Sequence, residues 1–265
     1  MFGTIVGDIA GSSYEGCLPP IKTKKFMWFD AKAHFTDDTV TTIAVAAALM
    51  EGKKTKCGYT DALCRQLRYW CRIYPDVGFG GYFKQWFLSD IAGPYNSYGN
   101  GAAMRVSPAA WVGESLTEVQ ELAELTALVS HNHPQAVKGA IAAASTVYLA
   151  RTGADKEAIR AYLRQYFYPM DKTLAEIRPG YTFTSDTEMS VPEALEAFLE
   201  SESFADAICN AVSLGGDTDT QAAIAGAAAE AYYGVPAAVW QQSDTYLTPD
   251  LRNILHAFSR QYMKN

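Results

Sequence analysis

Alanine-rich segments with helical periodicity recur along this chain, and they constrain its fold more than any other feature. Within them apolar residues return at every third or fourth position, which keeps them on one face of an α-helix. Alanine favours helix formation, and its small side chain lets helices pack closely. None of these segments matches the alternation typical of a half-buried strand. The sequence therefore predicts an all-α fold, with helices over residues 39–50, 59–72, 116–129, 135–150, 156–165, 191–199, 204–212, 221–233 and 249–262.

Loops rich in turn-forming residues separate the predicted helices. They include GFGGY at 78–82, GPYNSYGNG at 93–101 and RPGYTFTSDTEMS at 178–190. Each is short or contains aromatic residues, so none resembles a flexible linker, and we find neither a fixed-period repeat nor a low-complexity tract. A length of 265 residues alone would allow one domain or two. We expect a compact, orthogonal multi-helix single domain over residues 1–265.

The charge and cysteine content limit the partners and the location of the chain. A formal net charge of -7 and a pI near 5.1 argue against non-specific nucleic-acid binding or binding to acidic membranes, which depends on clustered Lys and Arg. The 5 cysteines are odd in number and form no CxxC pair, so neither a disulfide framework nor a zinc ribbon is indicated. Cys57, Cys64 and Cys71 are expected to be small buried residues of a reduced protein.

The N-terminal segment MFGTIVGDIAGS does not resemble a signal peptide, because it lacks a basic region and carries Asp8 within its apolar stretch. No uninterrupted apolar run is long enough to span a bilayer. We therefore expect a cytoplasmic protein without a membrane partner.

Two clusters of aspartate and threonine each precede an apolar helical segment. Asp37 and Asp38 lie in FTDDTV, and Asp217 and Asp219 lie in GGDTDT. In a regular helix adjacent side chains point about 100° apart, so neither cluster could converge on one point from the middle of a helix. We expect both clusters where a helix begins, because a non-helical N-cap lets neighbouring side chains turn toward a common centre. The glycine pair at 215–216 would permit an unusual backbone conformation or a close approach there.

The chemistry of the two clusters favours a metal site. Asp and Thr supply only oxygen ligands, which suit Mg²⁺ or Mn²⁺ better than Zn²⁺, a metal that prefers His and Cys. The alternative is that these residues only cap the helices, which would explain one cluster alone. A cap needs a single short polar side chain, however, whereas each cluster offers two carboxylates and two threonines beside an apolar run. Such charge is costly unless a cation compensates it.

Several motifs resemble the signature of the ADP-ribosylglycohydrolase family, and they follow the family's order over nearly the whole chain. They are GTIVGDIAGSSYEG, FTDDTV, SYGNGAAMRVSP, SHNHPQAVKGA, SVPEALEAFLES and NAVSLGGDTDTQAAIAGAAAEAYYG. The resemblance implies an all-α fold with a dinuclear metal centre at the bottom of a cleft. Its ions would be two Mg²⁺, with Mn²⁺ as an alternative. Their ligands would be Thr36, Asp37, Asp38, Asp217, Asp219 and Thr220.

Two acidic residues near the N-terminus have expected roles at this centre. Glu15, in GSSYEG, matches a family glutamate on a mobile flap that is required for catalysis; without the resemblance it would be interpreted as a solvated loop residue. Either Glu15 or Asp38 would be the acid/base group. Asp8 is expected to be a buried hydrogen-bonding residue that supports the site. If GDIAGSSY is helical, Asp8 and Glu15 share a face.

The loop SYGNG resembles the family's ADP-ribose-binding loop. Glycine lets backbone N–H groups approach phosphates, an aromatic ring can stack on adenine, and Asn can hydrogen-bond ribose hydroxyls. The alternative is an ordinary turn, because these residue types are common in loops. The predicted substrate-binding residues are Ser97, Tyr98, Gly99 and Asn100, with Gly80 and Gly81 as further phosphate-binding candidates and His131 near the distal ribose.

Two further residues of these motifs receive no catalytic role. His133 precedes Pro134 and is expected to cap the next helix or to be structural. Arg105 could pair with an acidic residue in the core as readily as with a phosphate.

The predicted reaction is hydrolysis of the bond between ribose C1″ and an acceptor in an ADP-ribosylated substrate, with release of ADP-ribose. Two metal ions would orient the 2″ and 3″ hydroxyls and polarise a water molecule. A dinuclear metal phosphohydrolase and a non-catalytic ADP-ribose-binding protein are the alternatives. The acceptor, whether arginine, serine, a nucleobase or a small metabolite, stays open because loops such as 18–34 and 178–190 would recognise it.

Overall fold

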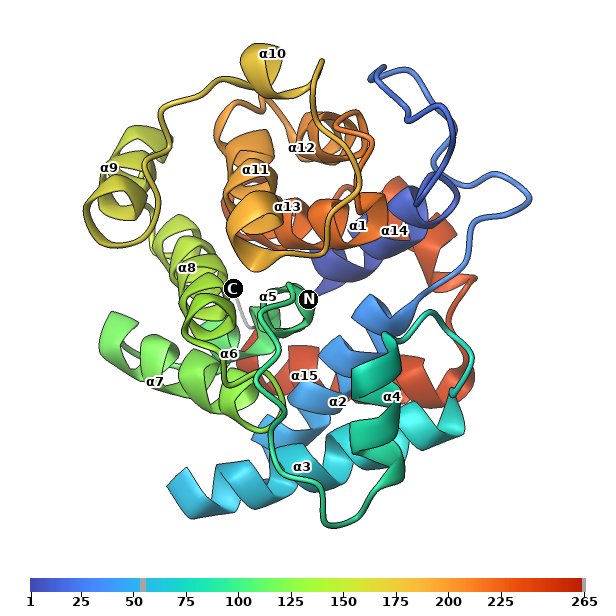
Figure 1. Ribbon diagram of the computed structural model, residues 1–265, viewed down its shortest axis with the longest axis vertical. Helices are drawn as coiled ribbons and strands as arrows, with labels where there is room; N and C mark the ends of the chain where they lie inside the picture. The colour runs from blue at the N-terminus through green and yellow to red at the C-terminus, as the bar shows by residue number, and fades with distance from the viewer. Residues whose placement is uncertain (53–55, 264–265) are drawn as a thin grey trace.

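Helices form the regular structure of the described part of the computed structural model, residues 1–52 and 56–263, apart from an isolated β-bridge between Gly99 and Asp186 (Figure 1). The all-α prediction is therefore confirmed. In chain order the helices are α1 (Phe2–Ser12), α2 (Asp37–Glu51), α3 (Lys56–Ile73), α4 (Gly81–Leu88), α5 (Gly101–Met104), α6 (Ser107–Val112), α7 (Leu116–Leu128), α8 (Pro134–Arg151), α9 (Lys156–Tyr166), α10 (Leu174–Ile177), α11 (Thr187–Leu199), α12 (Phe204–Val212), α13 (Thr218–Tyr233), α14 (Ala237–Asp244) and α15 (Pro249–Tyr262).

Capping side chains explain where several of the predicted helices begin. The side chains of Ser115, Ser203 and Thr248 each accept a hydrogen bond from the backbone N–H three residues further on, at the starts of α7, α12 and α15. The predicted boundaries are close to the observed ones except at α11. That helix begins at Thr187 after an Asp186 cap, so Pro192 lies inside it, although proline usually stands in the first turn.

The helices that the sequence does not predict are either short or buried on all sides. Helices α4, α5, α6, α10 and α14 have at most 8 residues, too few to show a helical period. Helix α1 is longer, but every residue from Gly3 to Ser12 is buried, so no polar face reveals its periodicity.

Helix α1 packs lengthwise against α13 in the interior of the molecule (Figure 1). The contact is backbone to backbone: a Cβ atom added at Gly7 would lie 2.0 Å from the carbonyl oxygen of Ala222, and one added at Gly3 would lie 2.1 Å from that of Gly226. Only glycine permits an approach this close. It brings Asp8, at the middle of α1, near the start of α13.

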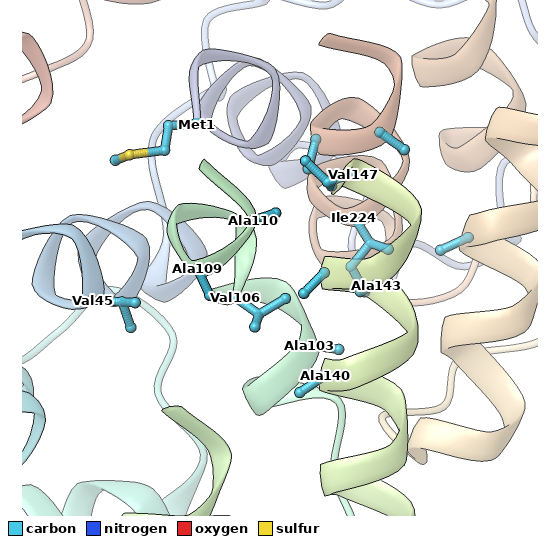
Figure 2. Packing of buried hydrophobic residues seen from close by; sticks show 14 of the residues in the cluster. Met1, Val45, Ala103, Val106, Ala109, Ala110, Ala140, Ala143, Val147 and Ile224 are labelled. Atoms are coloured by element: carbon cyan, nitrogen blue, oxygen red, sulfur yellow. The ribbon is translucent and has the colours of Figure 1, made fainter. Parts of the chain in front are cut away.

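Small apolar side chains also fill the core around α5 and α6. Figure 2 shows Ala103 of α5 and Val106, the N-cap of α6, on the side toward Ala140 and Ala143 of α8. Alanine on both sides lets short helices lie close to α8, and α8 in turn contacts α13. Helices α2, α5 and α13 contact one another, so the core holds the elements that carry the acidic clusters and the SYGNG loop together.

The expectation that the three cysteines at 57, 64 and 71 are buried free thiols is met in part. Cys71 is buried, whereas Cys64 is only partly buried; both are free thiols, and the Cys57 side chain lies outside the described residues. Within the described residues, no helix is both long and apolar enough to cross a membrane.

Candidate active site

Both aspartate clusters lie at the start of a helix, as the sequence predicts. Thr36 is the N-cap of α2, and its Oγ1 accepts a hydrogen bond of 3.3 Å from the backbone N–H of Asp38. Asp217 is the N-cap of α13. The carboxylates therefore lie at the positive ends of two helix dipoles, where negative charge is favoured.

The glycine pair before α13 adopts the geometry that its sequence suggests. Gly215 has φ of 68°, and a Cβ atom there would lie 2.3 Å from the carbonyl oxygen of Ile21. A Cβ atom on Gly216 would lie 2.4 Å from the ring of Tyr181. Both positions thus require glycine, and together they direct the chain into the acidic cluster.

The fold brings the two clusters together from distant parts of the chain. Carboxylate oxygens of Asp8, Asp38 and Asp219 lie within 4.8 Å of one another, and so do those of Glu15, Asp217 and Asp219. Asp219 belongs to both groups. Thr220 Oγ1 also donates a hydrogen bond of 3.1 Å to Asp38 Oδ2, which links α13 directly to α2. Two adjacent groups with a shared carboxylate are suited to a pair of neighbouring divalent ions.

No basic side chain in the described residues forms a salt bridge with these carboxyl groups. Burial raises the pKa of Asp38 and Asp219 well above the usual range, and the neighbouring carboxylates raise it further. In addition, Asp38 Oδ1 is buried and has no hydrogen-bond partner among the described residues. Uncompensated buried charge is costly. An oxygen-only, electron-rich donor set of this kind fits a hard divalent cation.

Asp8 of α1 is bonded to the residues at the start of α2, beside the first cluster. Its carboxylate accepts hydrogen bonds from the Thr36 backbone N–H at 2.9 Å, from Thr36 Oγ1 at 2.7 Å and from the Thr39 backbone N–H at 3.1 Å, together with one from Thr39 Oγ1. Both carboxylate oxygens are thus occupied. These bonds confirm that Asp8 is a buried hydrogen-bonding residue, and they hold the start of α2 against α1.

Glu15 approaches the centre from a turn that follows α1. Helix α1 ends at Ser12, so the idea that Asp8 and Glu15 share a helical face is wrong. Glu15 is exposed as a residue, yet its carboxylate lies beside those of Asp217 and Asp219. The pKa of Glu15 is raised by burial of the carboxyl group and by the charges of Asp217 and Asp8. The arrangement places Glu15 on the solvent side of the acidic centre.

A cavity of about 340 Å³ opens above the acidic centre, within the size range of small-molecule sites. It is lined by parts of both clusters, of both glycine-rich loops and of the segment that carries His131. The sequence-predicted residues that line it are Glu15, Asp37, Asp38, Gly80, Gly81, Ser97, Gly99, Asn100, His131, Asp217, Asp219 and Thr220.

The SYGNG loop is tied to its surroundings by hydrogen bonds. The Asn100 backbone N–H donates to the Ser185 carbonyl at 2.9 Å, and the Thr187 N–H donates to the Tyr98 carbonyl at 3.1 Å. The loop at 93–101 therefore pairs with the loop at 178–190. The Asn100 side chain donates a hydrogen bond of 2.8 Å to Asp217 Oδ2, so this amide joins the loop to the acidic centre.

Aromatic side chains lie both inside the cavity and at its edge. Tyr98 is not among the residues that line the cavity: the residue is 54% exposed, and its ring contacts that of His133 edge-on, with 5.9 Å between the ring centroids. Because both of its neighbours in the chain line the cavity, Tyr98 lies at the rim. Sequence reasoning missed the aromatic residues of the lining, although they follow or belong to the loops at 78–82, 93–101 and 178–190. They are Tyr82, Phe83, Tyr95 and Phe183.

The histidines of SHNHP have different environments. His131 is buried and lines the cavity. His133 caps α8, accepting a hydrogen bond from the Gln135 backbone N–H at 3.2 Å, as expected. Arg105 also lines the cavity and is completely buried, and no carboxylate among the described residues forms a salt bridge with it. The acidic pairing considered for Arg105 is therefore not found in this part of the chain.

Several known proteins are similar in sequence to this chain. Human ADP-ribosylhydrolase ARH3 is 27% identical over 91% of this chain and 86% of its own length. The ADP-ribosyl-(dinitrogen reductase) glycohydrolase of Rhodospirillum rubrum is 27% identical over 88% and 84%. ADP-ribosylarginine hydrolase Tri1 of Pseudomonas putida is 30% identical over 77% of this chain and 60% of its length.

A solved structure described as an ADP-ribosylglycohydrolase-related protein complex has the same fold. It aligns with a TM-score of 0.71 over 97% of this chain and 94% of that chain, at 24% sequence identity. The sequence model of the ADP-ribosylglycohydrolase family matches residues 1–262. With a match of this extent, the chain belongs to the ADP-ribosylglycohydrolase family of hydrolases.

Proposed function

We propose that this protein hydrolyses the bond between C1″ of ADP-ribose and an acceptor group, and that it depends on two divalent cations, Mg²⁺ or Mn²⁺. The observation that carries the proposal is the convergence of the buried carboxyl groups of Asp38, Asp217 and Asp219 at the base of the cavity. The names of the relatives, which refer to ADP-ribosyl substrates, support the same substrate class.

The chain's own residues would hold the metal ions at the two helix starts. The proposed ligands are Thr36, Asp37, Asp38, Asp217, Asp219 and Thr220, and all except Thr36 line the cavity. When bound, the ions supply orientation of the vicinal ribose hydroxyls and activation of a water molecule. Asp8 would keep the first set in place through its hydrogen bonds to Thr36 and Thr39.

Glu15 is the better of the two acid/base candidates because of its position. Asp38 is buried, and its Oδ2 already accepts a hydrogen bond from Thr220, so it is suited to bind a metal ion. Glu15 stands on the solvent side of the same centre, where the acceptor would leave. A carboxyl group there could donate a proton to the leaving group and then accept one from water.

The remainder of ADP-ribose would occupy the cavity above the centre. The start of α4, with Gly80 as N-cap and Gly81 as the first helical residue, presents free backbone N–H groups that suit a phosphate. His131 would approach the distal ribose, and the aromatic residues of the cavity and its rim would contact the adenine. The acceptor would be recognised by the loops at 18–34 and 178–190, and arginine, serine, nucleobase and small-molecule acceptors all remain candidates.

One panel assay tests the function and separates it from its alternatives. The purified protein is incubated with arginine-, serine- and nucleobase-linked ADP-ribose conjugates, with Mg²⁺ or EDTA, and the products are identified by mass spectrometry. We expect Mg²⁺-dependent release of intact ADP-ribose from at least one conjugate. Release of AMP would instead indicate a phosphohydrolase, and binding without turnover would indicate a non-catalytic protein.

A further inference from the structure

Arg105 is a buried cation in the cavity wall, without a carboxylate partner among the described residues. Its Nη2 donates hydrogen bonds to the Thr126 carbonyl at 2.9 Å and to Ser130 Oγ at 2.8 Å. Its guanidinium lies over the ring of Phe83 at 5.4 Å. A buried charge normally needs an ion pair. Among the described residues, however, Arg105 forms hydrogen bonds only with neutral groups. One of these groups, the Ser130 hydroxyl, also contacts His131.

The hydroxyl group of Ser130 connects Arg105 to His131. Ser130 Oγ lies 2.8 Å from His131 Nδ1, and Ser130 is completely buried. Arginine can only donate, so one lone pair of Ser130 Oγ is already used by Arg105. If His131 Nδ1 carried a hydrogen, Ser130 Oγ would accept hydrogen bonds from both Arg105 and His131. The hydrogen of the Ser130 hydroxyl would then have no acceptor among the described residues. A buried donor without a partner is costly.

The favourable arrangement has the Ser130 hydroxyl donating to His131 Nδ1, which leaves the ring hydrogen on Nε2. A doubly protonated ring would meet the same conflict at Ser130. Burial and the nearby charge of Arg105 both hold the pKa of His131 well below its usual range, so the ring stays neutral.

The Nε2 edge of this ring is available to the cavity. His131 lines the cavity wall, and its Nε2 shares a hydrogen bond of 3.5 Å with Tyr95 Oη, which Nε2–H donates in this tautomer. A bond of that length is weak, so the hydrogen can turn to a better acceptor. A Cβ atom on Gly101 would lie 2.9 Å from Nε2, so glycine at the first position of α5 leaves the room that this edge occupies. The hydrogen on Nε2 can therefore be offered to a bound molecule.

We propose that Arg105 and Ser130 are positioning residues that hold His131 as the neutral Nε2–H tautomer, so that it offers a hydrogen-bond donor to a ribose oxygen in the cavity. The tautomer follows from the geometry alone, whereas the identity of the ligand rests on the proposed function. The site would accordingly favour ligands with an acceptor oxygen at this position.

Nitrogen NMR of the histidine rings in the free protein tests the tautomer, with His131 assigned from the spectrum of a His131→Asn variant. We expect an unprotonated Nδ1 and a protonated Nε2 in the wild type. Ser130→Ala and Arg105→Met should each yield a mixture of tautomers. Ser145→Ala is the matched control, because Ser145 is also buried and its Oγ has no hydrogen-bond partner among the described residues; its His131 signals should match the wild type.

Calorimetric titration with ADP-ribose gives the second readout. Ser130→Ala should bind ADP-ribose roughly tenfold more weakly than the wild type and Ser145→Ala, the scale of one impaired buried hydrogen bond. A wild-type ring with its hydrogen on Nδ1 would overturn the proposal. So would a Ser130→Ala protein with an unchanged tautomer and unchanged affinity. If no variant binds ADP-ribose, the proposed function fails, and the spectrum of the free protein decides the tautomer separately.

Discussion

When they are ionised, Asp38 and Asp219 lower the free energy of unfolding of the metal-free protein. Asp38 and Asp219 lie in a buried, negatively charged centre, and burial followed by neighbouring charges raises the pKa of each. A carboxyl group whose pKa rises on folding stabilises the folded state only while it is protonated. That contribution is complete below the unfolded pKa and is lost as the pH rises through the folded pKa.

Replacing Asp219 with Asn should therefore stabilise the metal-free protein at neutral pH. In EDTA, we expect the wild type to melt at a lower temperature than Asp219→Asn once the pH is above about 4. The difference in melting temperature should reach roughly 2–4 °C or more. Saturating Mg²⁺ should reverse the order, because only the wild type gains full metal binding. The exposed change Asp61→Asn is the control. Identical melting curves of wild type and Asp219→Asn in EDTA at pH 7 would contradict the account.

Glu15→Gln distinguishes catalysis from binding. The amide keeps the size of the side chain but cannot transfer a proton, so turnover should fall by roughly 10²–10⁴-fold while ADP-ribose affinity stays near the wild-type value. Glu124→Gln, at an exposed position on α7, should leave both unchanged. Steady-state kinetics and calorimetry provide the two readouts. Near wild-type turnover of Glu15→Gln would leave Asp38 as the acid/base candidate.

Tyr98→Ala tests the predicted aromatic contact at the rim. Loss of one stacking ring should weaken ADP-ribose binding by about twofold to tenfold, with no change in Mg²⁺ affinity. Tyr69→Ala is a matched control, since Tyr69 is 56% exposed on α3, close to the 54% of Tyr98. If calorimetry shows the same affinity for both variants and the wild type, the adenine contact lies with the aromatic residues inside the cavity.

Among the elements, α1 shows why local sequence patterns do not reveal the whole fold. Amphipathic helices such as α9 and α15 display their period because one face meets water, and the sequence predicts them well. Helix α1 is buried on all sides, so the same criterion fails. The feature of its sequence that reflects its position is the spacing of Gly3, Gly7 and Gly11, which all face the backbone of α13.

Gly7→Ala should destabilise the protein by about 1–3 kcal/mol or more, because the added methyl group would overlap the backbone of α13. The clash is with a carbonyl oxygen at 2.0 Å rather than with a flexible side chain. Gly180→Ala is the control, since a Cβ atom there meets nothing within 4 Å. Urea denaturation provides the free energies of unfolding. Equal stability of the two variants would show that α1 and α13 can separate without cost.

At the scale of the whole molecule, the site is made by contacts that link distant parts of the chain. Local patterns predict that each cluster starts a helix, whereas only the family resemblance places Glu15 at the same centre as Asp217, and neither predicts that Asn100 bonds to Asp217. These pairings depend on how the helices pack, which local patterns do not encode. For the same reason the lining aromatic residues were missed.

The backbone of α1 packs against that of α13, which joins the first helix to a helix near the other end of the described chain. We propose on this basis that residues 1–265 form a single domain. Urea denaturation followed by two spectroscopic probes should then show coincident transitions. Two separate transitions would show independent units.

The dependence of catalysis on bound metal is the central claim, and it is tested most directly by the activity of metal-stripped protein. ADP-ribose release from a confirmed substrate is measured after EDTA treatment and again after stepwise addition of Mg²⁺ or Mn²⁺. We predict that activity is absent after stripping and returns with added metal, and that folded Asp38→Ala and Asp217→Ala proteins stay inactive throughout, because each lacks an anionic metal ligand. Full activity in the EDTA-stripped wild type would contradict the account.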